Sequence, residues 1–244
     1  MVYSRNYTVT VGLSLFMLYG VFSDAFSQGK PEPDPFWSER LSMVREQIAA
    51  RGISDPGVLA SMAAVRRHLF IDPSNEDIAY SDRPIPIGHG QTISQPFIVA
   101  LMTELLDLDS TDVVFELGTG SGYQAAVLSK IVSKVFTMEI IEPLGKADAD
   151  RFNKLGYKNV MVQVGDGYYG LPGQAPFDAI IVTAAASHIP PPLLNQLKPG
   201  GKMAIPIGNV FFVQNLMLVE KDSMGNVTTE NILPVRFVPL TGNQ

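Results

Sequence analysis

The sequence predicts an α/β fold with a mostly parallel sheet, an antiparallel C-terminal edge and a small N-terminal helical appendage. After residue 112, short apolar runs alternate with segments of helical periodicity, which indicates strands joined by right-handed helical crossovers. The first turn between such a run and its helix is rich in glycine. Near the C-terminus, two apolar runs are separated only by a short polar turn, which favours a hairpin.

The composition limits the classes of protein to consider. A chain of 244 residues with 46% hydrophobic residues can bury one substantial core. The net charge of −6 argues against a nucleic-acid partner, because such binding depends on clustered Lys and Arg. There are no cysteines, and His68, His89 and His188 lie far apart, so we expect no metal centre. We expect a monomer.

The N-terminus differs from the rest of the chain. Residues 1–28 form a leader that is typical of signal peptides, with an apolar run from Val9 to Phe22 followed by the small residues Ala25 and Ser27. The run is too short and too polar for a comfortable membrane span. A weak membrane anchor, or a leader that is never translated, remains an alternative. No stable membrane partner is expected beyond this leader.

A Pro-rich linker over residues 29–35 should connect the leader to a single domain over residues 36–244. Residues 36–82 should hold the N-terminal helices and their connection. The spacing predicts a first helix over residues 36–51 that ends at Gly52, and a second helix with Ser54 or Asp55 as its N-cap.

Residues 83–95 are predicted to form an irregular loop, because two prolines and two glycines disfavour regular structure. The loop leads into a helix over residues 96–106 and carries hydroxyl and amide groups, so it is a plausible substrate site. Ser94, just before Gln95 and Pro96, also fits a helix N-cap. The residues themselves leave both roles open.

The core over residues 96–244 should contain five parallel strands, their helices and a final hairpin. The apolar runs predict strands over residues 112–115, 135–138, 160–164, 177–182 and 202–206. Helices are expected over residues 124–131, 143–155 and 190–197, a turn over 198–201, and the hairpin strands over 211–219 and 228–235.

The glycine turn, which is the segment from Glu116 to Tyr123, follows the first core strand. Its three glycines let the backbone bend tightly and come close to a ligand. The helix behind the turn offers unpaired N–H groups at its N-terminus. These features indicate a nucleotide-type ligand.

Acidic side chains follow three of the predicted strands. Ligands of open α/β sheets bind beyond the carboxyl ends of the strands, where Glu116, Glu139 and Asp166 fall. Glu139 lies about twenty residues after the first glycine, where a carboxylate accepts from ribose hydroxyls. Asp166, between two glycines, can also be read as a turn residue.

The glycine spacing separates two classes of ligand. A dinucleotide fingerprint is Gly-x-Gly-x-x-Gly, but here Tyr123 stands where the third glycine belongs. Glu116 would repel a pyrophosphate, whereas it could help to hold an ammonium group. The turn therefore favours S-adenosyl-L-methionine over a nicotinamide dinucleotide.

From about Leu41 to Thr241 the chain resembles the protein-L-isoaspartate O-methyltransferases. The glycine turn alone is typical of methyltransferases in general, whereas residues 90–96 together with 235–240 are nearly diagnostic of this family. The other matching segments are residues 116–123, 165–167 and 176–184. The resemblance implies a Rossmann-like methyltransferase sheet. It also implies methyl transfer from S-adenosyl-L-methionine to the α-carboxylate of isoaspartyl residues in damaged proteins and peptides, which begins their repair through a succinimide.

The resemblance also implies roles for individual residues. Ser94 would be the active-site serine, with Thr92 nearby, and the segment from Val235 to Val238 would line the peptide cleft. We thus expect substrate-binding residues Ile93, Val235, Phe237 and Val238, and cofactor-binding residues Glu116, Gly118, Thr119, Gly120, Ser121, Gly122, Glu139, Asp166 and Gly167.

Three alternative functions remain at this point. They are a small-molecule carboxyl or O-methyltransferase, a nicotinamide-dependent oxidoreductase, and a non-catalytic binder of damaged peptides. The glycine spacing disfavours the oxidoreductase, and the full set of cofactor-contact candidates disfavours the binder. Because S-adenosyl-L-methionine is made inside cells, we expect a cytoplasmic enzyme, although the leader would instead export it.

Overall fold

The computed structural model describes residues 34–209 and 212–242. The chain divides into two units, Met1–Trp37 and Ser38–Gln244, and the sheet lies in the second. The expected leader, residues 1–28, and residues 29–33 of the linker lie outside the described part of the chain. Within the described part, no helix has the length and apolar character needed to cross a membrane.

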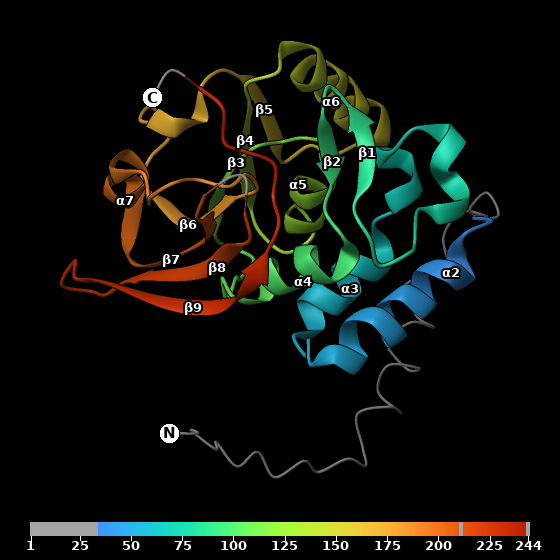
Figure 1. Cartoon of the computed structure of the whole chain (residues 1–244), viewed down its shortest axis with the longest axis horizontal. Helices are drawn as coiled ribbons and strands as arrows, with labels where there is room; N and C mark the ends of the chain where they lie inside the picture. The colour runs from blue at the N-terminus through green and yellow to red at the C-terminus, as the bar shows by residue number, and fades with distance from the viewer. Residues whose placement is uncertain (1–33, 210–211, 243–244) are drawn as a thin grey trace, which may run out of the picture. The chain divides into compact units, whose positions relative to one another are not determined.

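A seven-stranded sheet with the order β5-β4-β3-β6-β7-β8-β9 forms the centre of the second unit (Figure 1). Neighbouring strands from β5 to β7 are parallel, while β8 and β9 are antiparallel, which confirms the expected mixed sheet. The strands are β3 (Val113–Leu117), β4 (Lys134–Glu139), β5 (Val160–Val164), β6 (Phe177–Val182), β7 (Leu197–Ile207), β8 (Gln214–Lys221) and β9 (Val227–Val235).

The central strands are almost entirely apolar because both of their faces are buried. The rings of Phe115 and Phe177 stack across β3 and β6, with centroids 5.2 Å apart. The crossover helices are α5 (Tyr123–Leu128), α6 (Glu142–Leu155) and α7 (Pro191–Gln196), and a 3₁₀ turn, η5 (Gly167–Tyr169), follows β5. The turn predicted over residues 198–201 is instead part of β7, whose pairing with β6 shifts register after Phe177.

The N-terminal helices are present but less regular than predicted. The first helical stretch comprises α2 (Trp37–Ser42), the π-helical η1 (Met43–Ile48) and the 3₁₀ turn η2 (Ala49–Arg51), and it ends at Gly52 as expected. Asp55 rather than Ser54 caps α3 (Pro56–Ala64), because its Oδ1 accepts from Val58 N at 2.7 Å. Two 3₁₀ segments, η3 (Arg67–Phe70) and η4 (Pro73–Ile78), lead to the hairpin described next.

The prediction of an irregular loop over residues 83–95 was wrong. The chain forms an antiparallel hairpin, β1 (Ile85–Gly88) and β2 (Gln91–Ile93), which is labelled in Figure 1. His89 and Gly90 form its turn with φ of 52° and 72°, a left-handed pair that matches the twist of hairpin strands. Proline is tolerated because every strand of a two-stranded sheet is an edge strand.

The N-cap interpretation of Ser94 was also wrong. The N-cap of α4 (Pro96–Glu104) is Gln95, whose side chain makes no capping hydrogen bond. Asp82 serves the helix instead, because its Oδ1 accepts from Phe97 N at 3.2 Å. Ser94 therefore stands between the hairpin and α4 without a capping function.

The hairpin turn gives a stability prediction. Gly90→Ala should lower the free energy of unfolding by about 1 kcal/mol, because alanine is strained at φ of 72° although nothing lies within 4 Å of the added Cβ. Gly173→Ala is the matched control, since its Cβ also meets nothing within 4 Å and its backbone is not left-handed. Urea unfolding measures both variants. Equal stability of the two would contradict the hairpin geometry.

Candidate functional site

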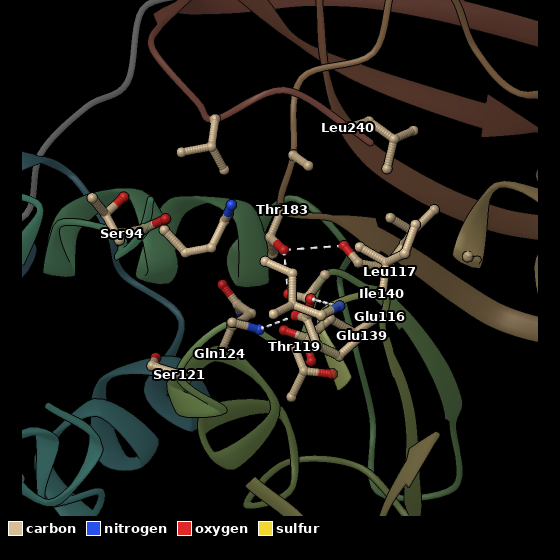
Figure 2. A pocket seen from close by; sticks show the side chains of 18 of the residues that line it. Ser94, Glu116, Leu117, Thr119, Ser121, Gln124, Glu139, Ile140, Thr183 and Leu240 are labelled. Carbon is tan, nitrogen blue, oxygen red and sulfur yellow. Dashed lines mark hydrogen bonds between the residues drawn. The ribbon is translucent and has the colours of Figure 1, made fainter. Parts of the chain in front are cut away.

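A cavity opens at the carboxyl ends of β3, β4 and β6, beside the glycine turn (Figure 2). The end of the hairpin forms another part of its wall, and the C-terminal segment after β9 closes the side near Leu240. Parallel strands bring their carboxyl ends to one edge of the sheet, so residues distant in sequence meet there. The expected cofactor-binding residues that line this cavity are Glu116, Gly118, Thr119, Gly120, Ser121, Glu139 and Gly167.

The first glycine of the turn is fixed to the end of β6. The Thr183 hydroxyl lies 3.0 Å from Leu117 O and 2.5 Å from Gly118 O and donates to these carbonyls. Gly118 has φ of 96°, and an added Cβ would lie 2.5 Å from Thr183 Oγ1. Only glycine satisfies both the backbone angle and this close approach.

The middle of the turn is fixed to the end of β4. Glu139 is only 4% exposed, and its Oε2 accepts from Gly120 N at 2.8 Å while Oε1 accepts from Ile141 N at 2.9 Å. The carboxylate expected to accept from ribose hydroxyls therefore already accepts from two backbone N–H groups. Since a carboxylate offers about four lone-pair sites, further donors can still bind it.

Glu116 belongs to the wall of the same cavity, and one of its carboxyl oxygens is buried without a partner among the described residues. Its side chain is fully buried, and Thr137 Oγ1 donates to Oε2 at 2.5 Å. Thr137 Oγ1 in turn lies 2.7 Å from Thr119 Oγ1. Within the described part of the chain, Glu116 Oε1 has no hydrogen-bond partner. Burial raises the pKa of Glu116 to about 8, against the opposing effect of the Thr137 hydrogen bond. A buried, unpaired carboxyl oxygen on a cavity wall fits a cationic donor group of a ligand.

Two of the expected cofactor-binding residues lie outside the cavity wall. Gly122 has φ of 80° and serves as the N-cap of α5, and an added Cβ would lie 2.9 Å from Phe152 Cζ. Asp166 caps η5 through Tyr168 N at 3.0 Å. Its carboxylate lies against Gly242, where an added Cβ would be 2.6 Å from Oδ2.

A second cavity of about 500 Å³ lies between the hairpin, the start of α4 and the end of β9. Of the residues predicted to bind the substrate, Val235, Phe237 and Val238 line this cavity, whereas Ile93 is buried and lines the first cavity. The two cavities have in common the residues Thr92, Ser94, Thr183 and Val238. We call these four residues the shared wall.

Several residues of the site were not found from the sequence. Thr183 directly follows β6, so the strand-end rule that selected Glu139 would also have selected it. Thr137 lies inside β4 and gave no signal, because its hydroxyl matters only through its contact with Glu116. Arg51 borders the second cavity, stacks on the Phe97 ring at 3.4 Å and binds Asp82 Oδ2 at 2.6 Å.

The sequence model of the family described as protein-L-isoaspartate(D-aspartate) O-methyltransferase matches residues 38–244. Protein-L-isoaspartate O-methyltransferase 1 of Nitrosospira multiformis is 62% identical over 83% of this chain and 87% of its own length. Protein-L-isoaspartate O-methyltransferase 2 of Syntrophobacter fumaroxidans is 56% identical over 86% of this chain and 88% of its own.

Solved structures give the same result at lower sequence identity. A protein-L-isoaspartate O-methyltransferase with 28% identity superposes with a TM-score of 0.75 over 85% of this chain and 66% of that chain, just under two thirds of its length. A β-aspartate methyltransferase from Plasmodium falciparum, in complex with S-adenosyl-L-homocysteine, has 27% identity and a TM-score of 0.71 over 84% of this chain and 99% of that chain. The chain therefore belongs to the protein-L-isoaspartate O-methyltransferase family.

Proposed function

We propose that this chain transfers a methyl group from S-adenosyl-L-methionine to the free α-carboxylate of L-isoaspartyl residues in damaged proteins and peptides. The backbone amide nitrogen that follows the ester can then attack the ester carbonyl without the enzyme, which forms a succinimide and releases methanol. Addition of water to the succinimide converts part of the substrate to normal aspartyl linkages. The observation that carries the proposal is the shared wall, which joins a cavity beside the glycine turn to a larger cavity bordered by the end of β9 and residues 236–238. A cavity of about 500 Å³ suits a peptide better than a small acid.

The residues of the first cavity fit the methyl donor. S-adenosyl-L-methionine supplies, when bound, a methyl group on a sulfonium leaving group. We assign the unpaired Glu116 oxygen to its ammonium group and Glu139 to its ribose hydroxyls, with the backbone of residues 118–121 along its length. Gly167 lines the far wall, and Asp166, which caps the turn around Gly167, supports that wall.

The residues of the shared wall position the acceptor. An α-carboxylate has a pKa of roughly 3 to 4, so at neutral pH it is ionised and needs no general base. Ser94 and Thr92 offer hydroxyl donors that can orient it, while Ile93, Val235, Phe237 and Val238 hold the peptide around it. Alignment of the reacting groups can contribute on the order of 7–11 kcal/mol, so we assign these residues a positioning role.

We further propose that the enzyme acts as a monomer in the cytoplasm, where its cofactor is made. The leader over residues 1–28 would instead direct it out of the cytoplasm if it is cleaved as a signal peptide. N-terminal sequencing of the native protein distinguishes these two cases.

A methyl-transfer assay with labelled S-adenosyl-L-methionine and paired peptides tests the reaction. The pair differs only in an aspartyl or isoaspartyl linkage at one position. We expect base-labile methyl ester on the isoaspartyl peptide alone, because only that linkage leaves an α-carboxylate free on the side chain. Equal labelling of both peptides, or labelling of small acids only, would instead indicate a less specific carboxyl methyltransferase. Peptide binding without methyl transfer would indicate a non-catalytic binder.

Glu116 gives a prediction for stability against pH. Its pKa is raised from 4.5 to about 8 in the folded chain. Between these two pH values, the folded state therefore holds a proton that the unfolded state has released. The stability due to Glu116 is present below the unfolded pKa and is lost as pH rises through about 8. Glu116→Gln cannot lose a proton. Without cofactor, this variant should gain on the order of a few kcal/mol of unfolding free energy over wild type between about pH 5 and pH 9.

Urea unfolding at each pH measures this difference. Asp148, whose pKa burial also raises, contributes to both proteins and largely cancels in the comparison. Parallel pH profiles for wild type and Glu116→Gln would mean that Glu116 is ionised throughout this pH range. That result would refute the raised pKa of Glu116.

A further inference from the structure

One face of α6 packs against the outside of the glycine turn. Asp148, Arg151 and Phe152 share this face at positions i, i+3 and i+4. Arg151 Nη1 donates to the backbone carbonyl of Ser121 at 2.8 Å and also to Asp148 Oδ1 in a short contact. One guanidinium group thus joins the helix to the turn.

The contact between α6 and the turn leaves no space. An added Cβ on Gly122 would lie 2.9 Å from Phe152 Cζ and 3.6 Å from Asp148 Oδ1. Phe152 is buried and its ring packs against Phe70, over which the Arg151 guanidinium also lies, 5.9 Å from the ring centroid. The Arg151 side chain is therefore held on several sides, and its position is well defined.

The charge balance shows why Asp148 and Arg151 depend on each other. Asp148 is only 1% exposed while Arg151 is 28% exposed. Burial raises the pKa of Asp148 to about 7, Arg151 lowers it, and the neighbouring Glu139 raises it. Within the described residues, Asp148 Oδ2 has no hydrogen-bond partner, so Arg151 is the main compensation for this buried carboxyl.

We propose that Asp148 and Arg151 are a positioning pair for cofactor binding: Arg151 fixes the Ser121 carbonyl, and Asp148 fixes Arg151. Neither side chain lines the cofactor cavity, so both act through the backbone of residues 118–121. That backbone needs an external contact, because glycines lose more conformational freedom on ordering than other residues. The inference rests on the proposed cofactor, S-adenosyl-L-methionine.

The test compares four variants of the full chain. Arg151→Gln removes the charged donor, Arg151→Lys keeps a charge, and Asp148→Asn removes only the partner charge. Lys146→Gln is the matched control on the same helix. It breaks an exposed ion pair, in which Lys146 Nζ lies 2.6 Å from Glu142 Oε1. Calorimetry measures the Kd for S-adenosyl-L-homocysteine, and kinetics give kcat and the peptide KM at saturating methyl donor. Thermal unfolding gives the Tm of each variant.

We expect Arg151→Gln to raise the Kd about tenfold, as for loss of a charged hydrogen bond, while peptide KM at saturating donor stays unchanged. Arg151→Lys should recover part of the affinity, since an ammonium donates but lacks the planar fork of arginine. Asp148→Asn should show a smaller loss than Arg151→Gln, and Lys146→Gln none.

Wild-type Kd in Arg151→Gln would overturn the inference. So would equal losses of cofactor affinity, peptide affinity and Tm without recovery in Arg151→Lys, because these indicate a purely structural role. If Arg151→Gln fails to fold, Arg151→Lys and Asp148→Asn replace it. A raised Kd with unchanged peptide KM in these variants supports the inference, and a wild-type Kd in both overturns it. Failure of the wild type itself to bind S-adenosyl-L-homocysteine would refute the proposed function, which is a distinguishable result.

Discussion

The backbone of the glycine turn is held from three sides, and the rest of the site depends on these contacts. Thr183 at the end of β6 donates to Gly118 O, Glu139 at the end of β4 accepts from Gly120 N, and Arg151 on α6 donates to Ser121 O. The glycines of the turn let its backbone come close to a ligand, but they supply no side chain that could fix its shape. Its shape is therefore set by side chains from three other elements.

The same arrangement concentrates buried carboxyl groups around one cavity. Glu116, Glu139 and Asp148 are all at most 4% exposed, and Glu116 keeps one oxygen without a partner in the described part of the chain. An unpaired buried acid is unfavourable alone, but it is offset when a cationic ligand binds. In the proposed role of Glu116, this cost to the stability of the free protein is offset by affinity for the cationic methyl donor. Thr183 links this site to the acceptor cavity, because it fixes the turn and also belongs to the shared wall.

The sequence was sufficient for the parts of the molecule that local pattern determines. Apolar runs and glycine spacing identified the parallel sheet, the turn and the strand-end acids. The hairpin was missed because its prolines were counted against it, although His89 and Gly90 form a favourable turn. The contacts of Asp82 with Phe97 N and of Arg151 with Ser121 O join residues 15 and 30 positions apart, and no local pattern reveals such pairs.

In the proposed function, the shared wall orients the acceptor carboxylate beside the methyl donor, and Ser94 is the residue of this wall to change first because it does not cap α4. The decisive measurement is kcat/KM of Ser94→Ala for an isoaspartyl peptide, together with its Kd for S-adenosyl-L-homocysteine and its Tm. We predict a loss in kcat/KM of about a hundredfold, from misplacement of the carboxylate, with unchanged Kd and Tm. An unchanged kcat/KM, or a parallel loss of activity and stability, would contradict the account.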